Sequence, residues 1–196
     1  MIVTRKATVS DAEKISELIY SLMHLFFAQP DGKGAEHFLQ MSTPTELAVF
    51  MAQPNINYLL GEVDGVFCGV VAVRNNSHLQ NLYVAPSFQG RGVGKYLWET
   101  ARDQAVAAGN SGEFTVNASL NAVPFYKRIG FEAVGDVSLM GGLKFQPMKL
   151  IQAQNKRFNA DAAPTGIDWM LQQPLQTGGE TGTSSVSILQ ERIKND

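Results

Sequence analysis

The sequence predicts an α+β (α/β) protein, because stretches with the apolar spacing of helices and stretches with the composition of strands both recur over its first 150 residues. An early helix is indicated by apolar residues that share one helical face: Ile15, Leu18, Ile19, Leu22 and Phe26. A hairpin is indicated by "NYLLGEVDGVFCGVVAVRNN", in which two β-rich runs meet at Asp64-Gly65, a pair that favours positive φ angles.

The N-terminal quarter of the chain is expected to add a strand and further helices. "IVTRKA", residues 2–7, has the composition of a short strand. The early helix is expected to begin at Ser10, because Ser10 and Glu13 have the spacing of a capping box. Residues 34–53 predict one or two short helices, divided near Pro44.

Strands and helices are also expected to alternate after the hairpin. Pro86 stops a strand, Gly109 ends a long helix, and Gly130 is well placed as the left-handed terminator of a short helix. The expected elements are a strand in "SHLQNLYVAP", a helix at 92–108, a strand in "EFTVNAS", a short helix in "NAVPFYKRI" and last strands in "FEAVGDV" and "LKFQPMKLI".

Composition and charge limit the classes of function. The chain of 196 residues is 44% apolar with a formal net charge of −2, so no nucleic-acid or membrane partner is expected. Its single cysteine, Cys68, excludes an intrachain disulfide, and no metal is predicted; an apolar neighbourhood suggests that Cys68 is buried. "MIVTRKATVSDAEK" lacks a signal-peptide core, and no apolar run approaches the roughly 20 residues that cross a bilayer. We therefore expect a cytoplasmic protein.

The stretch "PSFQGRGVGKYLWETA" places three glycines, Gly90, Gly92 and Gly94, directly before a helix. A helix N-terminus offers unpaired N–H groups and a partial positive charge, and glycines let the backbone approach an anion closely. The simpler interpretation is a strand-to-helix turn that needs positive φ angles. The sequence therefore leaves two alternatives here, a phosphate site and a turn.

Two common nucleotide-binding motifs do not fit this loop. A P-loop needs glycine where Gln89 stands and serine or threonine where Tyr96 stands. The dinucleotide fingerprint needs glycine at position 93 or 95, which here are Val93 and Lys95.

The motif that does fit is Q-x-x-G-x-G, formed by Gln89, Gly92 and Gly94 directly after the strand "LYVAP". A second stretch, "NASLNAVPFYKRIGFE" at 117–132, follows at a matching distance. Together they resemble the GCN5-related N-acetyltransferase (GNAT) superfamily, in particular its small bacterial members. The resemblance covers about residues 1–150. It implies a GNAT fold, a central mixed, mostly antiparallel twisted sheet flanked by helices, and leaves 151–196 as a polar C-terminal extension, docked or partly disordered.

The resemblance implies that the glycine loop wraps the pyrophosphate of acetyl-CoA, the co-substrate, and that the preceding strand pairs with its pantetheine arm. The Leu82 N–H is the expected donor to the acetyl oxygen. Lys95 and Arg91 are either phosphate-binding cations or solvated residues of the helix start. The expected cofactor-binding residues are Leu82, Tyr83, Val84, Gln89, Gly90, Arg91, Gly92, Val93, Gly94, Lys95, Asn117, Asn121 and Tyr126. Asn121 is also a candidate cap of the short helix that follows it.

Two residues are expected to carry proton transfer. The resemblance makes Tyr126 the acid that protonates the leaving thiolate, with a packing tyrosine as the alternative. Many relatives carry a glutamate near positions 80 or 81, where this chain has Gln80 and Asn81. His78 is then the nearest titratable candidate for the base. A solvent-exposed histidine at a strand start is the alternative role, and Glu62, Glu113 or a water chain are alternative bases.

The predicted function is an acetyl-CoA-dependent N-acetyltransferase that moves an acetyl group to a primary amine of a small molecule or peptide by direct attack. The alternatives are a non-catalytic acyl-CoA-binding regulator and a toxin-type acetyltransferase of aminoacyl-tRNA, which the net charge disfavours. A homodimer is possible for this family.

Acceptor choice is expected to lie in residues 24–54, where "HLFFAQPDGKGAEHFL" offers polar and aromatic candidates: His24, Phe26, Phe27, Glu36 and His37. Their alternative role is helix surface and core. In the extension, "GIDWML" is expected to dock on the catalytic domain or on a second subunit, because its apolar side chains are costly to leave in water.

Overall fold

The computed structural model describes residues 1–151. The expected docking of "GIDWML" falls outside these residues. In chain order the elements are β1 (Ile2–Lys6), η1 (Val9–Asp11), α1 (Ala12–Leu22), η2 (Met23–Leu25), α2 (Glu36–Met41), α3 (Pro44–Met51), β2 (Ile56–Val63), β3 (Val66–Arg74), β4 (His78–Val84), η3 (Pro86–Phe88), α4 (Val93–Ala107), β5 (Glu113–Ser119), α5 (Val123–Arg128), β6 (Glu132–Ala133), β7 (Ser138–Met140) and β8 (Leu143–Ile151).

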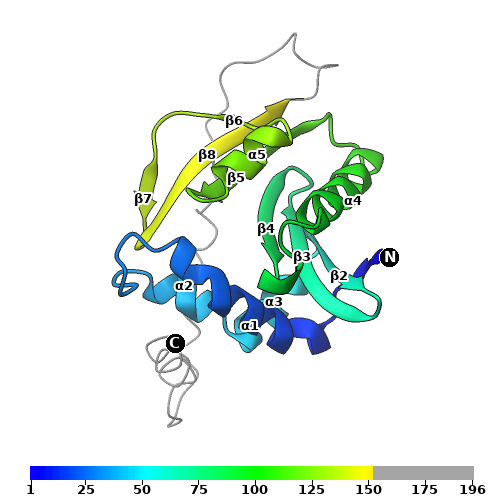
Figure 1. Ribbon diagram of the computed structural model, residues 1–196, viewed down its shortest axis with the longest axis horizontal. Helices are drawn as coiled ribbons and strands as arrows, with labels where there is room; N and C mark the ends of the chain where they lie inside the picture. The colour runs from blue at the N-terminus through cyan, green and yellow to red at the C-terminus, as the bar shows by residue number, and fades with distance from the viewer. Residues whose placement is uncertain (152–196) are drawn as a thin grey trace.

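One mixed sheet of eight strands organises the chain. Its order is β1-β2-β3-β4-β5-β8-β6, and β7 also pairs with β8. Every pair is antiparallel except β4–β5, which is parallel. Helices α1, α2 and α3 lie on one side of the sheet and α4 and α5 on the other (Figure 1). The expected mixed, mostly antiparallel sheet flanked by helices is confirmed.

The two middle strands, β4 and β5, separate soon after they meet. They pair only at His78↔Thr115 and Leu79↔Val116. Beyond these pairs the strands run apart, so that the sheet opens into two halves, β1–β4 and β5–β8 (Figure 1).

A β-bulge at Gln80 lies at the point of divergence. Ala72 pairs with Asn81 and the next residue of β3, Val73, pairs with Leu79, so Gln80 is the extra residue of β4 in this register. An extra residue on one strand bends it and increases its local twist. The bulge therefore turns the second half of β4 away from the direction of β5.

Each side of the sheet has its own hydrophobic core. The core under α1, α2 and α3 includes Ile15 and Leu60, both fully buried. The core under α4 and α5 is built around Trp98, whose ring lies 5.0 Å from that of Phe114 and 5.3 Å from that of Phe131. These two cores fix the helices on either side of the opening between β4 and β5.

A main-chain connection joins the segment after α1 to the start of β8. The Lys144 N–H donates to the Phe26 carbonyl at 2.7 Å, and the Ala28 N–H donates to the Gly142 carbonyl at 2.8 Å. Gly142 has φ +70° and passes so close to Gly34 that a Cβ atom on Gly142 would overlap the Gly34 and Ala35 backbone. The segment after α1 is thereby held against the start of β8.

Two local expectations are corrected by the structure. A capping box does form before the first helix, but between Thr8 and Asp11 and not between Ser10 and Glu13: the Asp11 carboxylate accepts from the Thr8 N–H at 2.8 Å and also from Arg5 at 2.7 Å. The Asp11 carboxylate is buried and held by the Arg5 cation, a contact that the exposed Ser10 cannot make. Strand β7 is not expected from the sequence, because its short and largely exposed stretch lacks strand periodicity. The hairpin at Asp64-Gly65 is confirmed, with φ angles of 51° and 79°.

We predict that Gly142→Ala destabilises the protein more than Gly135→Ala does. Both glycines have similar φ angles, +70° and +68°, so both substitutions carry the strain of a left-handed residue, about 1–2 kcal/mol. A Cβ at Gly135 meets no atom within 4 Å, whereas one at Gly142 overlaps backbone, which should add about 1–3 kcal/mol. Urea unfolding of the two variants measures the difference. Equal losses would show that the contact between Gly142 and Gly34 is dispensable.

Candidate functional site

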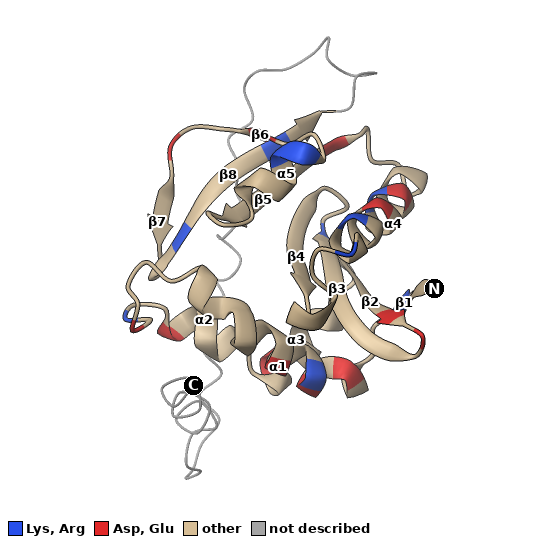
Figure 2. Cartoon of the chain, viewed as in Figure 1, with Lys and Arg blue, Asp and Glu red and all other residues tan. Residues whose placement is uncertain are grey.

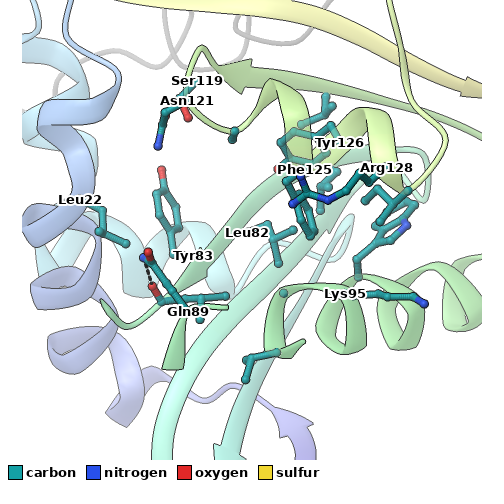
Figure 3. Close-up of a pocket in the computed structure, with 18 of the residues that line it drawn as sticks. Leu22, Leu82, Tyr83, Gln89, Lys95, Ser119, Asn121, Phe125, Tyr126 and Arg128 are labelled. Carbon is teal, nitrogen blue, oxygen red and sulfur yellow. Dashed lines mark hydrogen bonds between the residues drawn. The ribbon is translucent and has the colours of Figure 1, made fainter. Parts of the chain in front are cut away.

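A cleft of about 940 Å³ lies where β4 and β5 diverge. Residues from the end of α1 and η2, from β4, from the glycine loop and α4, and from β5 and α5 line it (Figure 3). Of the cofactor-binding residues expected from the sequence, those along the cleft are Leu82, Tyr83, Val84, Gln89, Gly90, Gly92, Val93, Gly94, Lys95, Asn117, Asn121 and Tyr126.

The cleft passes through the sheet and therefore has two sides. Side chains alternate along a strand, and after the bulge Leu82 and Val84 point into the core beneath α4. Tyr83 points the other way, into the core beneath α1, where its ring lies 6.0 Å from that of Phe26. We call these the α4 side, which carries the glycine loop, and the α1 side, which carries Leu22 and Phe26.

The backbone of β4 presents one edge to the cleft. The Ala85 N–H donates to the Cys68 carbonyl on β3 at 2.9 Å. Since backbone groups alternate in direction along a strand, those of Leu82 and Val84 point away from β3, toward the space that β5 has left. The Gln89 side-chain amide donates to the Val84 carbonyl at 3.0 Å and so fixes the glycine loop to the strand (Figure 3).

The three glycines of the loop serve different purposes. Gly90 and Gly92 have φ angles of +73° and +80°, and a Cβ at either position would meet no atom within 4 Å. Their requirement is therefore conformational, and the space before them is open. Gly94 is helical, and a Cβ there would lie 3.5 Å from both Phe125 and Val84. Gly92 is the N-cap of α4, so the unpaired N–H groups of that helix start beside the cleft.

The charged residues that line the cleft lie on α4 and α5. Lys95 and Glu99 form an ion pair of 3.8 Å, and Arg102 is paired with Asp103 at 2.7 Å. Arg128, at the end of α5, also lines the cleft, and its side chain lies beside Phe125 (Figure 3). Arg91 is not among the lining residues, and its guanidinium lies 5.8 Å from the Phe88 ring. The positive charges and the helix N-terminus together favour an anion on the α4 side.

Tyr126 reaches the cleft from α5. Its side chain is buried, packed against the rings of Phe125 and Phe131. Burial raises the pKa of the Tyr126 phenol above its usual range, so the hydroxyl stays protonated at neutral pH. Such a group can donate a proton or a hydrogen bond to an atom in the cleft.

Two asparagines approach the cleft from β5 and from the turn after it. Asn117 and Asn121 both line it, and Asn121 points toward the Tyr83 ring (Figure 3). The N-cap of α5 is Ala122, so the expectation that Asn121 caps this helix is wrong. Asn121 lies in the turn, one residue before the N-cap of α5, and its side chain points into the cleft.

His78 does not line the cleft. It lies at the junction where β4 and β5 still pair, is 7% exposed, and its Nδ1 is 2.7 Å from the Thr115 hydroxyl. Burial, with a smaller effect of Arg74, lowers the pKa of the His78 imidazole to about 4. The structure therefore holds His78 as a neutral residue between the two strands and does not bring it to the site as a base.

The other carboxylates considered as bases also lie elsewhere. Glu62 is 3.5 Å from Arg5, and Glu113 is 3.4 Å from Lys149; neither lines the cleft. Among the lining residues that the structure describes, Glu99 is the only carboxylate.

Several lining residues were not singled out from the sequence. Leu22, Leu25, Phe125 and Arg128 line the cleft, as does Phe26, one of the acceptor candidates. Of those candidates, His24, Phe27, Glu36 and His37 do not line it. The helical spacing of Leu22 and Phe26 indicated a buried face, but no local signal showed that this face reaches past the core to an opening.

Comparison with known proteins identifies the family. The model of the acetyltransferase (GNAT) domain matches residues 26–152. The chain belongs to the GNAT acetyltransferase family. No curated protein gives a significant match.

Solved structures of GNAT proteins share this fold. A GCN5-related N-acetyltransferase from Rhodopseudomonas palustris is 23% identical, with 76% of this chain and 94% of that chain covered and a TM-score of 0.64. PaiA N-acetyltransferase from Thermoplasma acidophilum, solved in complex with coenzyme A, is 19% identical over 77% and 99% of the two chains, with a TM-score of 0.62. A GNAT acetyltransferase from Streptococcus pneumoniae is 22% identical over 77% and 99%, with a TM-score of 0.56.

The described residues were also compared with what a membrane-spanning helix and a metal site require. Within residues 1–151, no helix combines the length and the hydropathy that a membrane span requires. The described part of the chain also holds no cluster of three or more potential metal-ligating side chains.

We predict that His78 makes the protein less stable below neutral pH. Its pKa of about 4 in the folded protein lies below the ordinary value of 6.5, so between these values the unfolded chain binds more protons. The free energy of unfolding should fall as pH drops from 6.5 toward 4, by up to about 3 kcal/mol. His78→Gln should flatten this dependence, while His24→Gln, at an exposed position, should not. Urea unfolding at several pH values measures it; an unchanged slope in His78→Gln would contradict the assignment.

Proposed function

We propose that this protein is an acetyl-CoA-dependent N-acetyltransferase that moves the acetyl group directly to a primary amine, without a covalent enzyme intermediate. The observation that carries the proposal is the cleft through the sheet, with the glycine loop and the start of α4 on one side and a second open side toward α1. A cleft of this form lets two substrates approach one point from opposite sides. Membership of the GNAT family supports acetyl-CoA as one of them.

The residues on the α4 side fit coenzyme A. The open space before Gly90 and Gly92 and the N–H groups at the start of α4 suit a pyrophosphate. The edge of β4 at Leu82 and Val84 suits the amide groups of a pantetheine arm, which can pair with it as an added strand would. The similar PaiA N-acetyltransferase was solved in complex with coenzyme A, which agrees with this assignment.

The chemistry requires two proton movements and one donor. The amine nitrogen forms a bond to the acetyl carbon, the bond from that carbon to sulfur breaks, and the nitrogen loses a proton. Tyr126 is assigned as the group that donates to the leaving sulfur, because it stays protonated and reaches the cleft. The Leu82 N–H is assigned as the donor to the acetyl oxygen, since it points into the cleft.

Water is the proposed acceptor of the proton from the amine. His78 is held away from the cleft, and Glu99 is engaged with Lys95 on the α4 side. Rate enhancement would then come from positioning and from the two donors, not from a protein base.

Turnover of acetyl-CoA with a panel of primary amines tests the function. Coenzyme A release and the acetylated amine, identified by mass spectrometry, should appear together and in equal amounts. Tight binding of acetyl-CoA without transfer to any amine would overturn the proposed enzyme and favour an acyl-CoA-binding regulator.

We predict that Gly92→Ala weakens acetyl-CoA binding at least tenfold, about 1.4 kcal/mol, because a side chain at φ +80° displaces the backbone at the start of α4. Gly65→Ala is the matched control. Gly65 has φ +79°, and a Cβ added there would also meet no atom within 4 Å, but it lies in the β2–β3 turn away from the cleft. Both variants should lose similar stability in urea, and calorimetry should show weaker binding in Gly92→Ala alone. Equal affinities would contradict the loop as the pyrophosphate site.

We predict that Tyr126→Phe lowers kcat about a hundredfold and leaves acetyl-CoA affinity nearly unchanged, because the lost hydroxyl acts on charge that develops during the reaction. Tyr96→Phe, on the exposed face of α4 outside the cleft lining, should leave kcat unaffected. Steady-state kinetics with a saturating amine, together with calorimetry, measures both effects. An unaltered kcat in Tyr126→Phe would make Tyr126 a packing residue.

A further inference from the structure

The α1 side of the cleft has its own chemical character. It is lined by apolar and aromatic side chains from the end of α1, from η2 and from β4: Leu22, Leu25, Phe26 and Tyr83. Leu25 is 38% exposed, and Leu120, next to the lining residues Ser119 and Asn121, is 39% exposed. Apolar surface therefore extends from the interior of the cleft to its rim.

The aromatic wall on this side is held in place. The Phe26 ring lies 6.0 Å from that of Tyr83 and 6.2 Å from that of Phe38. The Phe26 carbonyl accepts the hydrogen bond from the Lys144 N–H that joins the segment after α1 to β8. Aromatic side chains that are fixed in this way form a preformed pocket, which selects a ligand whose apolar part fits it.

Charged side chains line only the opposite side of the cleft. Among the described residues these are Lys95, Glu99 and Arg102 from α4 and Arg128 from α5. Figure 2 shows charged positions along α4 and α5, and others on α1; those of α1, Glu13, Lys14 and Glu17, do not line the cleft. On the α1 side the lining offers neither a carboxylate for an ammonium group nor a cation for a carboxylate, as far as the described residues extend.

We infer that the acceptor is a primary monoamine with an uncharged apolar body, such as an aromatic ring or an alkyl chain. This rests on the proposed function, which places the acceptor on the α1 side. An apolar body gains from contact with Leu22, Phe26 and Tyr83. A second ammonium or a carboxylate would lose its water there without gaining a partner, which disfavours polyamines, aminoglycosides and free amino acids.

Two polar groups on this side are placed to orient the reacting nitrogen. Asn121 and Tyr83 point toward one another across the cleft (Figure 3). Burial raises the pKa of Tyr83, so its phenol stays neutral and can donate or accept a hydrogen bond without adding charge. These two neutral groups can form hydrogen bonds with a single amine nitrogen.

Matched amine pairs test the inference in the acetyl-transfer assay. Octylamine is compared with its α,ω-diamine, and phenethylamine with phenylalanine, since each pair differs by one charged group. The monoamine of each pair should have a kcat/KM at least tenfold higher. A diamine, polyamine or amino acid that matches or exceeds the monoamines would overturn the inference while leaving the acetyltransferase function intact.

A substitution at the rim provides a second test. Leu25→Glu adds a carboxylate at a partly exposed position, and it should raise the preference for the diamine over octylamine at least tenfold relative to the unmodified protein. Val49→Glu, on α3 and outside the cleft lining, adds the same charge elsewhere and should change nothing. A preference that does not move in Leu25→Glu would show that the acceptor does not pass this rim.

Measurements of amine binding distinguish a wrong inference about the acceptor from a wrong proposed function. If no amine is acetylated, the proposed function is wrong, but the thermal midpoint of the protein with coenzyme A can still be measured with each amine. Octylamine should raise that midpoint more than its diamine does. An equal or larger shift with the diamine would overturn the assignment of the α1 side as an apolar monoamine site.

Discussion

The separation of β4 from β5 is the constraint on which the site depends. A strand inside a sheet has its backbone groups paired on both edges, but β4 is paired with β5 at two positions only. Beyond Leu79, one edge of β4 therefore faces an opening, and its backbone groups require partners other than a neighbouring strand, as the Val84 carbonyl finds in Gln89. An extended ligand with amide groups meets this requirement in the way that a neighbouring strand would. The bulge at Gln80 sits at the point where this arrangement begins.

Under the proposed function, the same opening separates the two substrates by their chemistry. Because it passes through the sheet, different helices line its two sides, and these helices carry different residues. The α4 side combines a helix N-terminus with Lys95, Arg102 and Arg128, which suits the phosphates of a large anionic co-substrate. The α1 side is an extension of the apolar core beneath α1, ending in Leu25 at the rim. The hydrogen bond from the Lys144 N–H to the Phe26 carbonyl holds the segment after α1 against β8.

Burial sets the protonation state of two titratable groups near the opening. It raises the pKa of Tyr126, so the phenol beside the cleft stays protonated at neutral pH. It lowers the pKa of His78, which removes the charge of the imidazole and, together with the contact to Thr115, confines it to the strand junction. A site arranged in this way supports a reaction whose acceleration comes from alignment and hydrogen-bond donors.

Features that depend on a few neighbouring residues could be predicted from the sequence. The turn at Asp64-Gly65, the glycine loop before α4 and the termination of α5 before Gly130 follow from the φ angles that short stretches demand. The order of strands and helices follows from apolar periodicity, which reflects the side of each element that is buried. For this reason the family resemblance could be stated from the sequence, and every expected cofactor-binding residue except Arg91 lines the cleft.

Features that depend on contacts between distant segments were decided only by the tertiary structure. Nothing local marks Gln80 as a bulge, since a bulge is defined by the register with β3. The burial of His78 against Thr115 and the meeting of Phe26 with Tyr83 join residues that are far apart in the chain. The sequence by itself determined most of the elements and the glycine loop before α4, because these are properties of short stretches of backbone. Only the packing of two sheet halves around an opening decided which side chains reach it and with what charge.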